Sequence, residues 1–202
     1  MKLYYAPGAC SLGPHIVIRE AGLDAALDKV AFNGAERTTE SGKDFRTINP
    51  QGAVPALETD DGEILTEAQV LLQYLASRAP AKALFPTEGV AKWRGLETLN
   101  FIATELHKGT SPLFKKPNDE AREATHKLLQ NRWGLFAQKL GDKPYVLGEF
   151  SVADAYAFTV LRWARGFKVD LSAYPKLEAY FERVQARPAV QQALTEEGLP
   201  TS

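Results

Sequence analysis

The hydrophobic pattern of this chain changes character near residue 80, and that change limits the folds available to it. Before this point short apolar strands alternate with helices, whereas from Val90 onward the apolar residues recur only at helical spacing. Residues 79–89, between the two regions, hold two prolines and little periodicity. We therefore expect an α/β domain over residues 1–80, a linker over 81–88 and an all-helical domain over 89–202.

The first domain is predicted to be a small mixed sheet with helices on its faces. Its strands are expected at residues 3–6, 27–32, 54–57 and 63–65, and its helices at 14–21 and 67–78, the second with Thr66 as N-cap. The first two strands belong to a βαβ unit and should be parallel, whereas the last two form a hairpin. The polar stretch at residues 34–52 is read as irregular.

The second domain is predicted to contain helices alone. They are expected at residues 90–115, 118–140, 152–164, 175–186 and 188–194. Pro175 and Pro188 stand at helix starts, where a missing N–H costs nothing. Ser151 and Asp154 have the spacing of a capping box, to which we assign a folding role and no catalytic one.

The composition excludes several classes of function. The 24 Lys and Arg residues nearly balance the 25 Asp and Glu residues, so a nucleic acid or an anionic membrane surface is not an expected partner. One cysteine and three scattered histidines give no ligand set, and we expect no metal. With no apolar run long enough to span a bilayer, the expected location is the cytoplasm.

Cys10, the single cysteine, follows a strand and a Pro7/Gly8 turn and directly precedes a helix. Free N–H groups in the first turn of a helix can lower the pKa of a nearby thiol, so we expect Cys10 to be reachable by solvent and partly ionised near neutral pH. Ser11 adds a hydroxyl beside it. The alternative is that a lone cysteine is a buried small hydrophobic residue.

Val54-Pro55 and Glu67-Ala68 are the second pair of candidate features. A cis bond at Val54-Pro55 would turn the Val54 backbone outward, where it could pair with the backbone of a bound peptide. Glu67 and Ala68 open a helix, so N–H groups there could bind a carboxylate while Glu67 accepts from an ammonium. The alternatives are a simple strand-start proline and an acid that complements the helix dipole.

A polar stripe is expected on the first helix of the second domain. Asn100, Thr104 and His107 lie at i, i+4 and i+7, which places them on one helix face. We interpret the stripe as one wall of a site. The alternative for His107 is a surface or hydrogen-bonded core histidine.

Five segments together resemble the beta class of bacterial glutathione transferases. They are YYAPGACSL, NPQGAVPAL, LTEAQVLLQYLA, NFIATELHKG and FSVADAYAFTVLRWA, in that order along nearly the whole chain. The resemblance implies a thioredoxin-like N-terminal domain, an all-helical C-terminal domain and assembly as a homodimer.

The resemblance also implies a role for each candidate residue. Cys10 corresponds to the hallmark cysteine of the class, which contacts the glutathione sulfur and can form a mixed disulfide with it, and Ser11 lies near the same sulfur. Val54, followed by the cis-proline Pro55, pairs with the cysteinyl part of glutathione. The other implied glutathione contacts are Glu67 and Ala68 at the γ-glutamyl group, Asn100, His107 and Lys108 on the helical wall, Arg37 near the glycyl carboxylate, and Thr104 and Glu105 toward the site of the neighbouring subunit.

The function so implied is conjugation of the glutathione thiolate, as co-substrate, to a small hydrophobic electrophile, a detoxification chemistry. His107 would orient or polarise groups near the sulfur, and Trp163 and Phe167 would contact the electrophile. Many relatives have serine where this chain has Ala68, and the loss of one neutral hydrogen bond weakens binding by up to about tenfold. Two alternatives stay open: a monothiol glutathione-dependent disulfide reductase acting through Cys10, and a non-catalytic binding or regulatory protein with this fold.

Overall fold

The computed structural model describes residues 1–201 and divides the chain into two compact units. The first unit comprises Met1–Leu84 together with the segment that begins at Arg187, and the second comprises Phe85–Ala186. The expected helical domain, 89–202, was therefore wrong at its end: the last helix belongs to the first unit.

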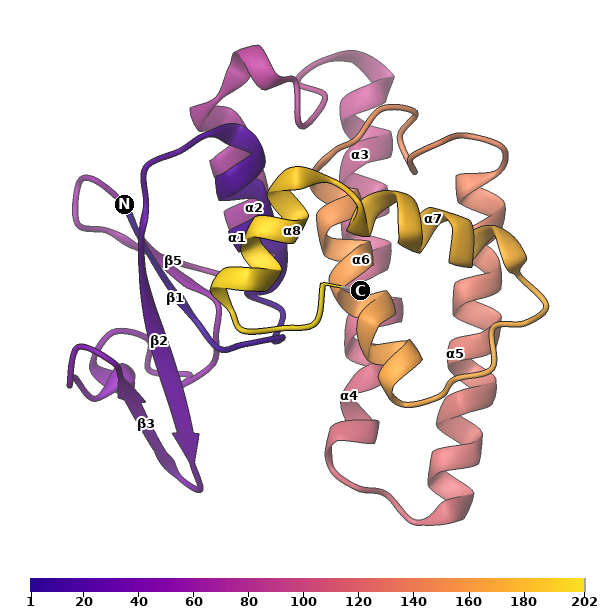
Figure 1. Cartoon of the computed structure of the whole chain (residues 1–202), viewed down its shortest axis with the longest axis horizontal. Helices are drawn as coiled ribbons and strands as arrows, with labels where there is room; N and C mark the ends of the chain where they lie inside the picture. Colours follow the sequence, from indigo (N-terminus) through magenta and orange to yellow (C-terminus); the bar gives the residue numbers. More distant parts are fainter. Residues whose placement is uncertain (202) are drawn as a thin grey trace. The chain divides into compact units, whose positions relative to one another are not determined.

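A five-stranded mixed sheet forms the centre of the first unit (Figure 1). Its order is β3-β2-β1-β4-β5, and only β1 and β2 are parallel, with Leu3 beside Leu27. The strands are β1 Lys2–Tyr5, β2 Ala26–Asn33, β3 Glu36–Thr39, β4 Ala56–Glu58 and β5 Ile64–Thr66. The sheet thus contains the predicted βαβ unit and hairpin, with β3 as an additional edge strand.

Strand β3 lies in the stretch that we predicted to be irregular. Of its four residues only Thr39 is fully buried. An edge strand with so little buried surface has no apolar alternation, and the sequence therefore gave no strand signal. Its position is fixed instead by antiparallel pairing with β2, from Val30–Thr39 to Asn33–Glu36.

The two faces of the sheet are covered differently. Helices α1 (Leu12–Ala21) and α2 (Ala68–Arg78) pack against each other, and they supply the buried side chains of Ile16 and Leu71. Because side chains alternate along a strand, Tyr4 points to the other face, where it packs on Phe45 of a short 3₁₀ turn. Both faces of β1 are therefore buried, and β1 leads directly into the turn that carries Cys10.

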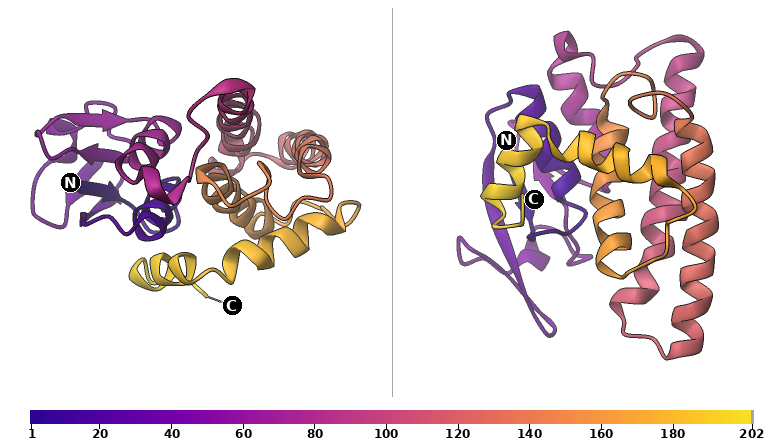
Figure 2. Two further views of the ribbon diagram at one scale, coloured as in Figure 1. Left: turned by 90° about the horizontal axis from the view of Figure 1, so that it is seen from above. Right: turned by 45° about the vertical axis from the view of Figure 1, so that its right-hand side comes forward.

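The final helix, α8 (Pro188–Glu196), packs on α1, as Figures 1 and 2 show. His15 of α1 is completely buried, with Nδ1 2.9 Å from a Glu197 carboxylate oxygen and Nε2 2.7 Å from one of Glu196. Arg19 donates to the same Glu196 oxygen at 2.7 Å. These contacts explain why the C-terminal segment belongs to the first unit, a long-range pairing that helical periodicity cannot reveal.

The second unit contains helices, within the residues that the structure describes. They are α3 Gly89–Phe101, a π-helical turn at Ile102–His107, α4 Lys108–Phe114, α5 Asp119–Leu140, α6 Val152–Gly166 and α7 Pro175–Gln185. The single helix expected over 90–115 was wrong because the π turn interrupts it. A π turn spaces its hydrogen bonds five residues apart and so rotates the following side chains out of α-helical register.

Helix α6 forms the core of this unit, and its N-terminus has the predicted capping box. The Asp154 carboxylate accepts from the N–H and hydroxyl of Ser151, from the Val146 N–H and from the Tyr180 hydroxyl, each at 2.9 Å. Burial raises the pKa of Asp154, while these hydrogen bonds act to lower it. The side chain thus fixes the start of α6 against α7 and the preceding loop.

No helix within residues 1–201 combines the length and apolar character needed to cross a bilayer.

Replacing His15 with leucine should strongly destabilise the first unit. The Glu197 side chain is completely buried, and removing the ring leaves its carboxylate without this partner, which typically costs about 3–5 kcal/mol. Urea unfolding at pH 7 measures the change. The control is Lys127→Ala, which removes an exposed ion pair with Glu123 in α5 and should leave the midpoint unchanged. Equal midpoints for wild type and His15→Leu would contradict the role of this contact.

Candidate active site

Cys10 lies in the turn between β1 and α1 and is half-buried. Its thiol donates a hydrogen bond to the Val54 carbonyl oxygen, with 3.1 Å between sulfur and oxygen. Burial raises the pKa of the thiol to about 12, and the negative charge of Glu67 adds to this, while the N–H groups of Cys10 and Ser11 act in the opposite direction. Desolvation thus outweighs the helix N-terminus and disfavours the thiolate that the sequence predicted.

Ser11 does not face the same space. The residue is completely buried. Its hydroxyl accepts from the Ala6 N–H and donates to the Ala6 carbonyl, both at 3.2 Å. The hydroxyl thus acts as donor and as acceptor within the turn that carries Cys10, and it closes that turn. The structure gives no support for the expected contact of Ser11 with a ligand sulfur.

The Val54-Pro55 peptide bond is cis. The segment before it is held by Asn49, whose side-chain amide donates to the Ala53 carbonyl at 2.7 Å. Within residues 1–201 the Val54 N–H has no hydrogen-bond partner, and the Val54 carbonyl accepts only the weak S–H donor of Cys10. This backbone can therefore pair with an extended peptide.

Glu67, rather than Thr66, occupies the N-cap of α2, which corrects the predicted helix start. Its φ of 70° is in the left-handed region, an uncommon conformation for a residue with a side chain. The Glu67 side chain is exposed and does not cap the helix. Ala68, the first residue of α2, is buried and brings no hydroxyl. The first N–H groups of α2 and the Glu67 carboxylate lie together at the same helix end.

Arg37 is held by its own hairpin. Its Nη1 donates to the carbonyls of Gly34 and Glu36, at 2.7 and 2.8 Å, and its guanidinium carbon lies 4.4 Å from the centre of the Phe32 ring. Through these contacts Arg37 stabilises the hairpin that β2 and β3 form.

In the second unit, His107 belongs to an aromatic cluster with Tyr156, Trp163, Phe114 and Phe167. His107 Nδ1 lies 2.6 Å from the Tyr156 hydroxyl, and the His107 and Trp163 ring centres are 5.0 Å apart. Phe114 makes edge contacts with Trp163 at 5.3 Å and with Phe167 at 4.9 Å, and it is 55 % exposed. The cluster therefore presents an accessible aromatic surface on α4 and α6.

The His107 ring is neutral at physiological pH. Burial, and secondly the Lys108 cation, lowers its pKa to about 4. The ring can consequently donate one hydrogen bond and accept one, and the Tyr156 hydroxyl uses one of these two positions.

The polar stripe predicted around His107 was wrong because it assumed α-helical spacing through the π turn. Asn100, Thr104 and Lys108 are exposed, and the Thr104 hydroxyl donates to the Asn100 carbonyl at 3.0 Å. Glu105 forms an ion pair with Arg132 of α5, with 2.7 Å between Nε and Oε2. Of these residues only His107 joins the aromatic cluster.

The structure thus brings two sets of expected residues together, one in each unit. The first unit gathers Cys10, Val54 and Glu67, and the second gathers His107, Trp163 and Phe167. Our sequence reasoning missed Tyr156 and Phe114. Tyr156 could have been found, since it stands seven residues before Trp163 and eleven before Phe167, on one face of a helix. No group of three or more His, Cys, Asp or Glu residues suited to a metal ion occurs among the described residues.

Comparison with known proteins places these features in a family. The model of the glutathione S-transferase N-terminal domain matches residues 8–78, and that of the C-terminal domain matches residues 101–188. The chain is 43 % identical to the glutathione S-transferase GstA of Escherichia coli O157:H7, over 98 % of this chain and 100 % of the relative.

Two solved structures are similar over 99 % of this chain and 100 % of their own. A beta class glutathione S-transferase of Sphingomonas chungbukensis is 45 % identical with a TM-score of 0.92. A sphingomonad glutathione S-transferase complexed with glutathione is 44 % identical with a TM-score of 0.91.

Alkylation of Cys10 should have no inflection near neutral pH in the ligand-free protein. A thiol whose pKa is raised remains protonated, so the rate constant with iodoacetamide should keep increasing up to at least pH 10. Mass spectrometry measures the rate without ambiguity because the chain has one cysteine. Glutathione alone, as control, should level off above its own pKa of about 8.5–9. An inflection for Cys10 at or below pH 8.5 would show an activated thiolate instead.

Proposed function

This chain belongs to the glutathione S-transferase family, and we propose that it joins the glutathione thiolate to a carbon of small hydrophobic electrophiles. The observation that carries this proposal is the neutral Cys10 thiol, which donates to the Val54 carbonyl beside the cis bond. That geometry offers an S–H donor next to a backbone segment able to receive a peptide.

Glutathione would bind the first unit through its backbone and its γ-glutamyl end. Its cysteinyl N–H and C=O would pair with the Val54 C=O and N–H, as in strand addition. Its γ-glutamyl carboxylate would accept from the first N–H groups of α2, and its ammonium would donate to Glu67. The positive φ of Glu67 supports this assignment, because strained backbone concentrates at ligand-binding positions.

Cys10 would then act as a hydrogen-bond donor to the glutathione sulfur. When the glutathione N–H takes the Val54 carbonyl, the Cys10 S–H is released and can turn to the ligand sulfur. A hydrogen bond to the charged form of an acid lowers its pKa, so the glutathione thiol would lose its proton to solvent while Cys10 keeps its own. In the transfer itself the sulfur bonds to the electrophilic carbon, and the leaving group departs with the electron pair of its bond.

The same property of Cys10 argues against disulfide exchange as the main activity. Exchange requires a thiolate on Cys10 to attack a mixed disulfide, and the burial that raises its pKa makes that species scarce at neutral pH. We therefore assign the mixed disulfide between Cys10 and glutathione a secondary place.

The electrophile would contact the aromatic cluster of the second unit. Phe114, Trp163 and Phe167 provide apolar ring surface, and the neutral His107 ring provides a hydrogen-bond donor without a competing positive charge. Small aromatic electrophiles suit this surface best.

We also propose that the protein is a homodimer. On α3, Val90 is 72 % and Trp93 65 % exposed, and on α5 Leu128 and Leu135 are 44 % and 40 % exposed. The ion pair between Glu97 and Lys139, at 2.8 Å, links α3 to α5. Exposed large apolar residues on adjoining helices favour association with a second copy.

Light scattering should give twice the chain mass of 22.2 kDa at micromolar concentration. Trp93→Glu should shift the mass to that of one chain, because association would bury an unpaired charge. Ala173→Glu places the same group on an exposed loop between α6 and α7 and serves as the control. A wild-type species of one chain mass only would contradict the dimer.

Substitution of Cys10 should separate transfer from exchange. Cys10→Ala removes the proposed donor to the thiolate, worth about 1.5–3 kcal/mol, and should lower kcat/KM with 1-chloro-2,4-dinitrobenzene about 10- to 100-fold, whereas Cys10→Ser keeps an O–H donor and most of the activity. Reduction of a mixed disulfide through Cys10 should be lost in both variants, since serine has no sulfur.

The pH profile gives an independent readout of the same proposal. With Cys10→Ala the pKa of bound glutathione should rise toward its value in solution. Equal loss of transfer in the alanine and serine variants would overturn the donor role. If both variants kept the wild-type rate of transfer, Cys10 would have no part in the reaction, and glutathione would be bound through Val54 and Glu67 alone.

A further inference from the structure

Tyr156 of α6 is a buried tyrosine whose hydroxyl meets the histidine of the aromatic cluster. Tyr156 is 2 % exposed, and its hydroxyl oxygen lies 2.6 Å from Nδ1 of His107. The two rings meet edge to face, with 5.8 Å between their centres. The phenol projects from a helix whose N-terminus is anchored by Asp154. The hydroxyl therefore approaches His107 from a fixed direction and forms a short hydrogen bond with it.

The hydrogen bond at Nδ1 determines which nitrogen of the His107 ring carries the proton. Burial, and secondly Lys108, lowers the pKa of His107 to about 4, so the neutral ring has one N–H and one lone pair. A phenol O–H is a more acidic donor than an imidazole N–H, and a neutral imidazole nitrogen is a better acceptor than a phenol oxygen. These preferences place the donor on Tyr156 and leave the ring proton on Nε2.

Nε2 of His107 is the ring nitrogen that a ligand can reach. Among residues 1–201 the His107 ring forms its side-chain hydrogen bond through Nδ1, and Nε2 is not one of the fully buried atoms without a partner. With the proton on Nε2, the ring offers an N–H to a group that gains negative charge. With the proton on Nδ1, the same position would offer a lone pair, which repels such a group.

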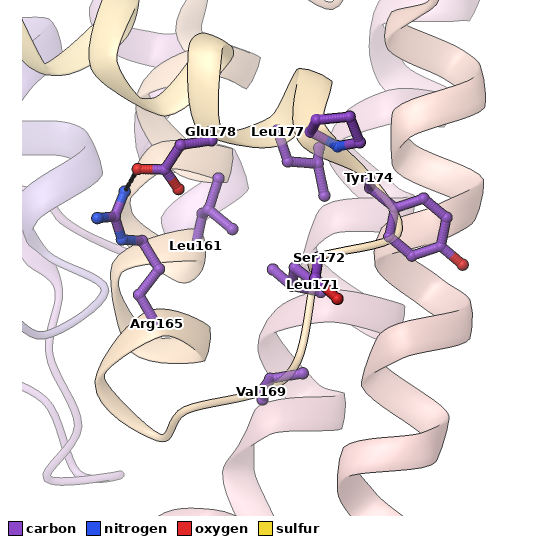
Figure 3. Close-up of a pocket in the computed structure, with 9 residues that line it drawn as sticks. Leu161, Arg165, Val169, Leu171, Ser172, Tyr174, Leu177 and Glu178 are labelled. Atoms are coloured by element: carbon purple, nitrogen blue, oxygen red, sulfur yellow. Dashed lines mark hydrogen bonds and ion pairs between the residues drawn. The ribbon is translucent and has the colours of Figure 1, made fainter.

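The pocket beside the C-terminal half of α6 is separate from this pair of residues. Figure 3 shows its lining, which includes Leu161, Arg165 and Glu178 but neither Tyr156 nor His107. Arg165 donates to Glu178 there at 2.8 Å. The Arg165 cation is therefore engaged by Glu178 rather than directed at the histidine, and Tyr156 is the hydrogen-bond partner of the ring.

We propose that Tyr156 is a positioning residue for the transfer reaction: its hydroxyl fixes the orientation of the His107 ring and keeps the ring proton on Nε2, so that the electrophile meets an N–H donor. This inference rests on the proposed function, because the electrophile is assigned to the same aromatic cluster. Tyr156 itself does not touch the substrate, and His107 keeps its Nε2 proton throughout. A donor that is already oriented needs no rearrangement when charge develops in the transition state.

Nitrogen NMR tests the position of the proton on the full chain without substrate. Correlations between ring nitrogens and protons distinguish a protonated nitrogen from an unprotonated one, and a spectrum of His107→Ala identifies the His107 signals among those of the three histidines. We expect the proton on Nε2 at pH 7, and Tyr156→Phe should introduce a second form with the proton on Nδ1. A wild-type proton on Nδ1, or spectra of His107 that Tyr156→Phe leaves unchanged, would overturn the proposal.

Kinetics test whether Tyr156 acts through His107. Tyr156→Phe should lower kcat with 1-chloro-2,4-dinitrobenzene about three- to tenfold, the effect of one hydrogen bond, and leave KM for glutathione unchanged. In a His107→Ala background the same substitution should have no further effect. Tyr180→Phe is the matched control, because it removes another buried tyrosine hydroxyl, which donates to Asp154 of α6 at 2.9 Å, and it should leave kcat unchanged.

The outcomes distinguish this inference from the proposed function. Thermal unfolding confirms that each variant is folded. Equal kcat in the wild type and in folded Tyr156→Phe, or losses that simply add in the double variant, would overturn the role of Tyr156 while the transferase activity stands. An inactive wild-type chain would instead overturn the proposed function, and with it any part of Tyr156 in transfer.

Discussion

The buried Glu197 carboxylate is the contact on which the arrangement of the first unit depends. One oxygen lies 2.9 Å from His15 Nδ1, and the other accepts the Gly8 N–H at 2.7 Å. The first contact attaches the C-terminal segment to α1, and the second attaches it to the turn that ends in Cys10. A buried carboxylate without hydrogen-bond partners is costly. These contacts therefore fix the C-terminal segment, α1 and the turn relative to one another. The Ser11 hydroxyl closes the same turn through Ala6.

The way in which the turn holds Cys10 influences the protonation state of its thiol. The turn points the half-buried thiol at the Val54 carbonyl, and burial raises its pKa, which favours the protonated form that donates this hydrogen bond. A helix N-terminus is present, but its favourable effect on a thiolate is smaller than the cost of desolvation here. The proposed transfer uses a protonated Cys10, whereas thiol exchange would use its thiolate, and the raised pKa of Cys10 favours the first.

Periodicity in the sequence predicted those parts of the structure that bury an apolar face. The βαβ unit, the hairpin and α5, α6 and α7 all carry that signal. It failed for β3, which buries little, and at the π turn, where one extra residue per turn breaks the register of Asn100 and Thr104 with His107. The placement of α8 depends on His15 meeting Glu196 and Glu197, about 180 residues away, and no local pattern encodes such a pairing. Cys10, Val54 and Glu67 were candidates from their positions beside strands and helix starts, and the family resemblance gave them their roles, whereas the raised pKa of Cys10 and the burial of Ser11 depend on surrounding atoms.

Helix α6 shows how an anchored N-terminus can order the side chains further along a helix. Its N-terminus is fixed by Asp154, which accepts hydrogen bonds from three other residues, and most of its side chains are buried. A helix so constrained holds Tyr156, Trp163 and Phe167 in fixed relation on one face, which a reaction at an aromatic surface requires. Anchoring at the start of α6 therefore contributes to the order of the aromatic cluster at its other end.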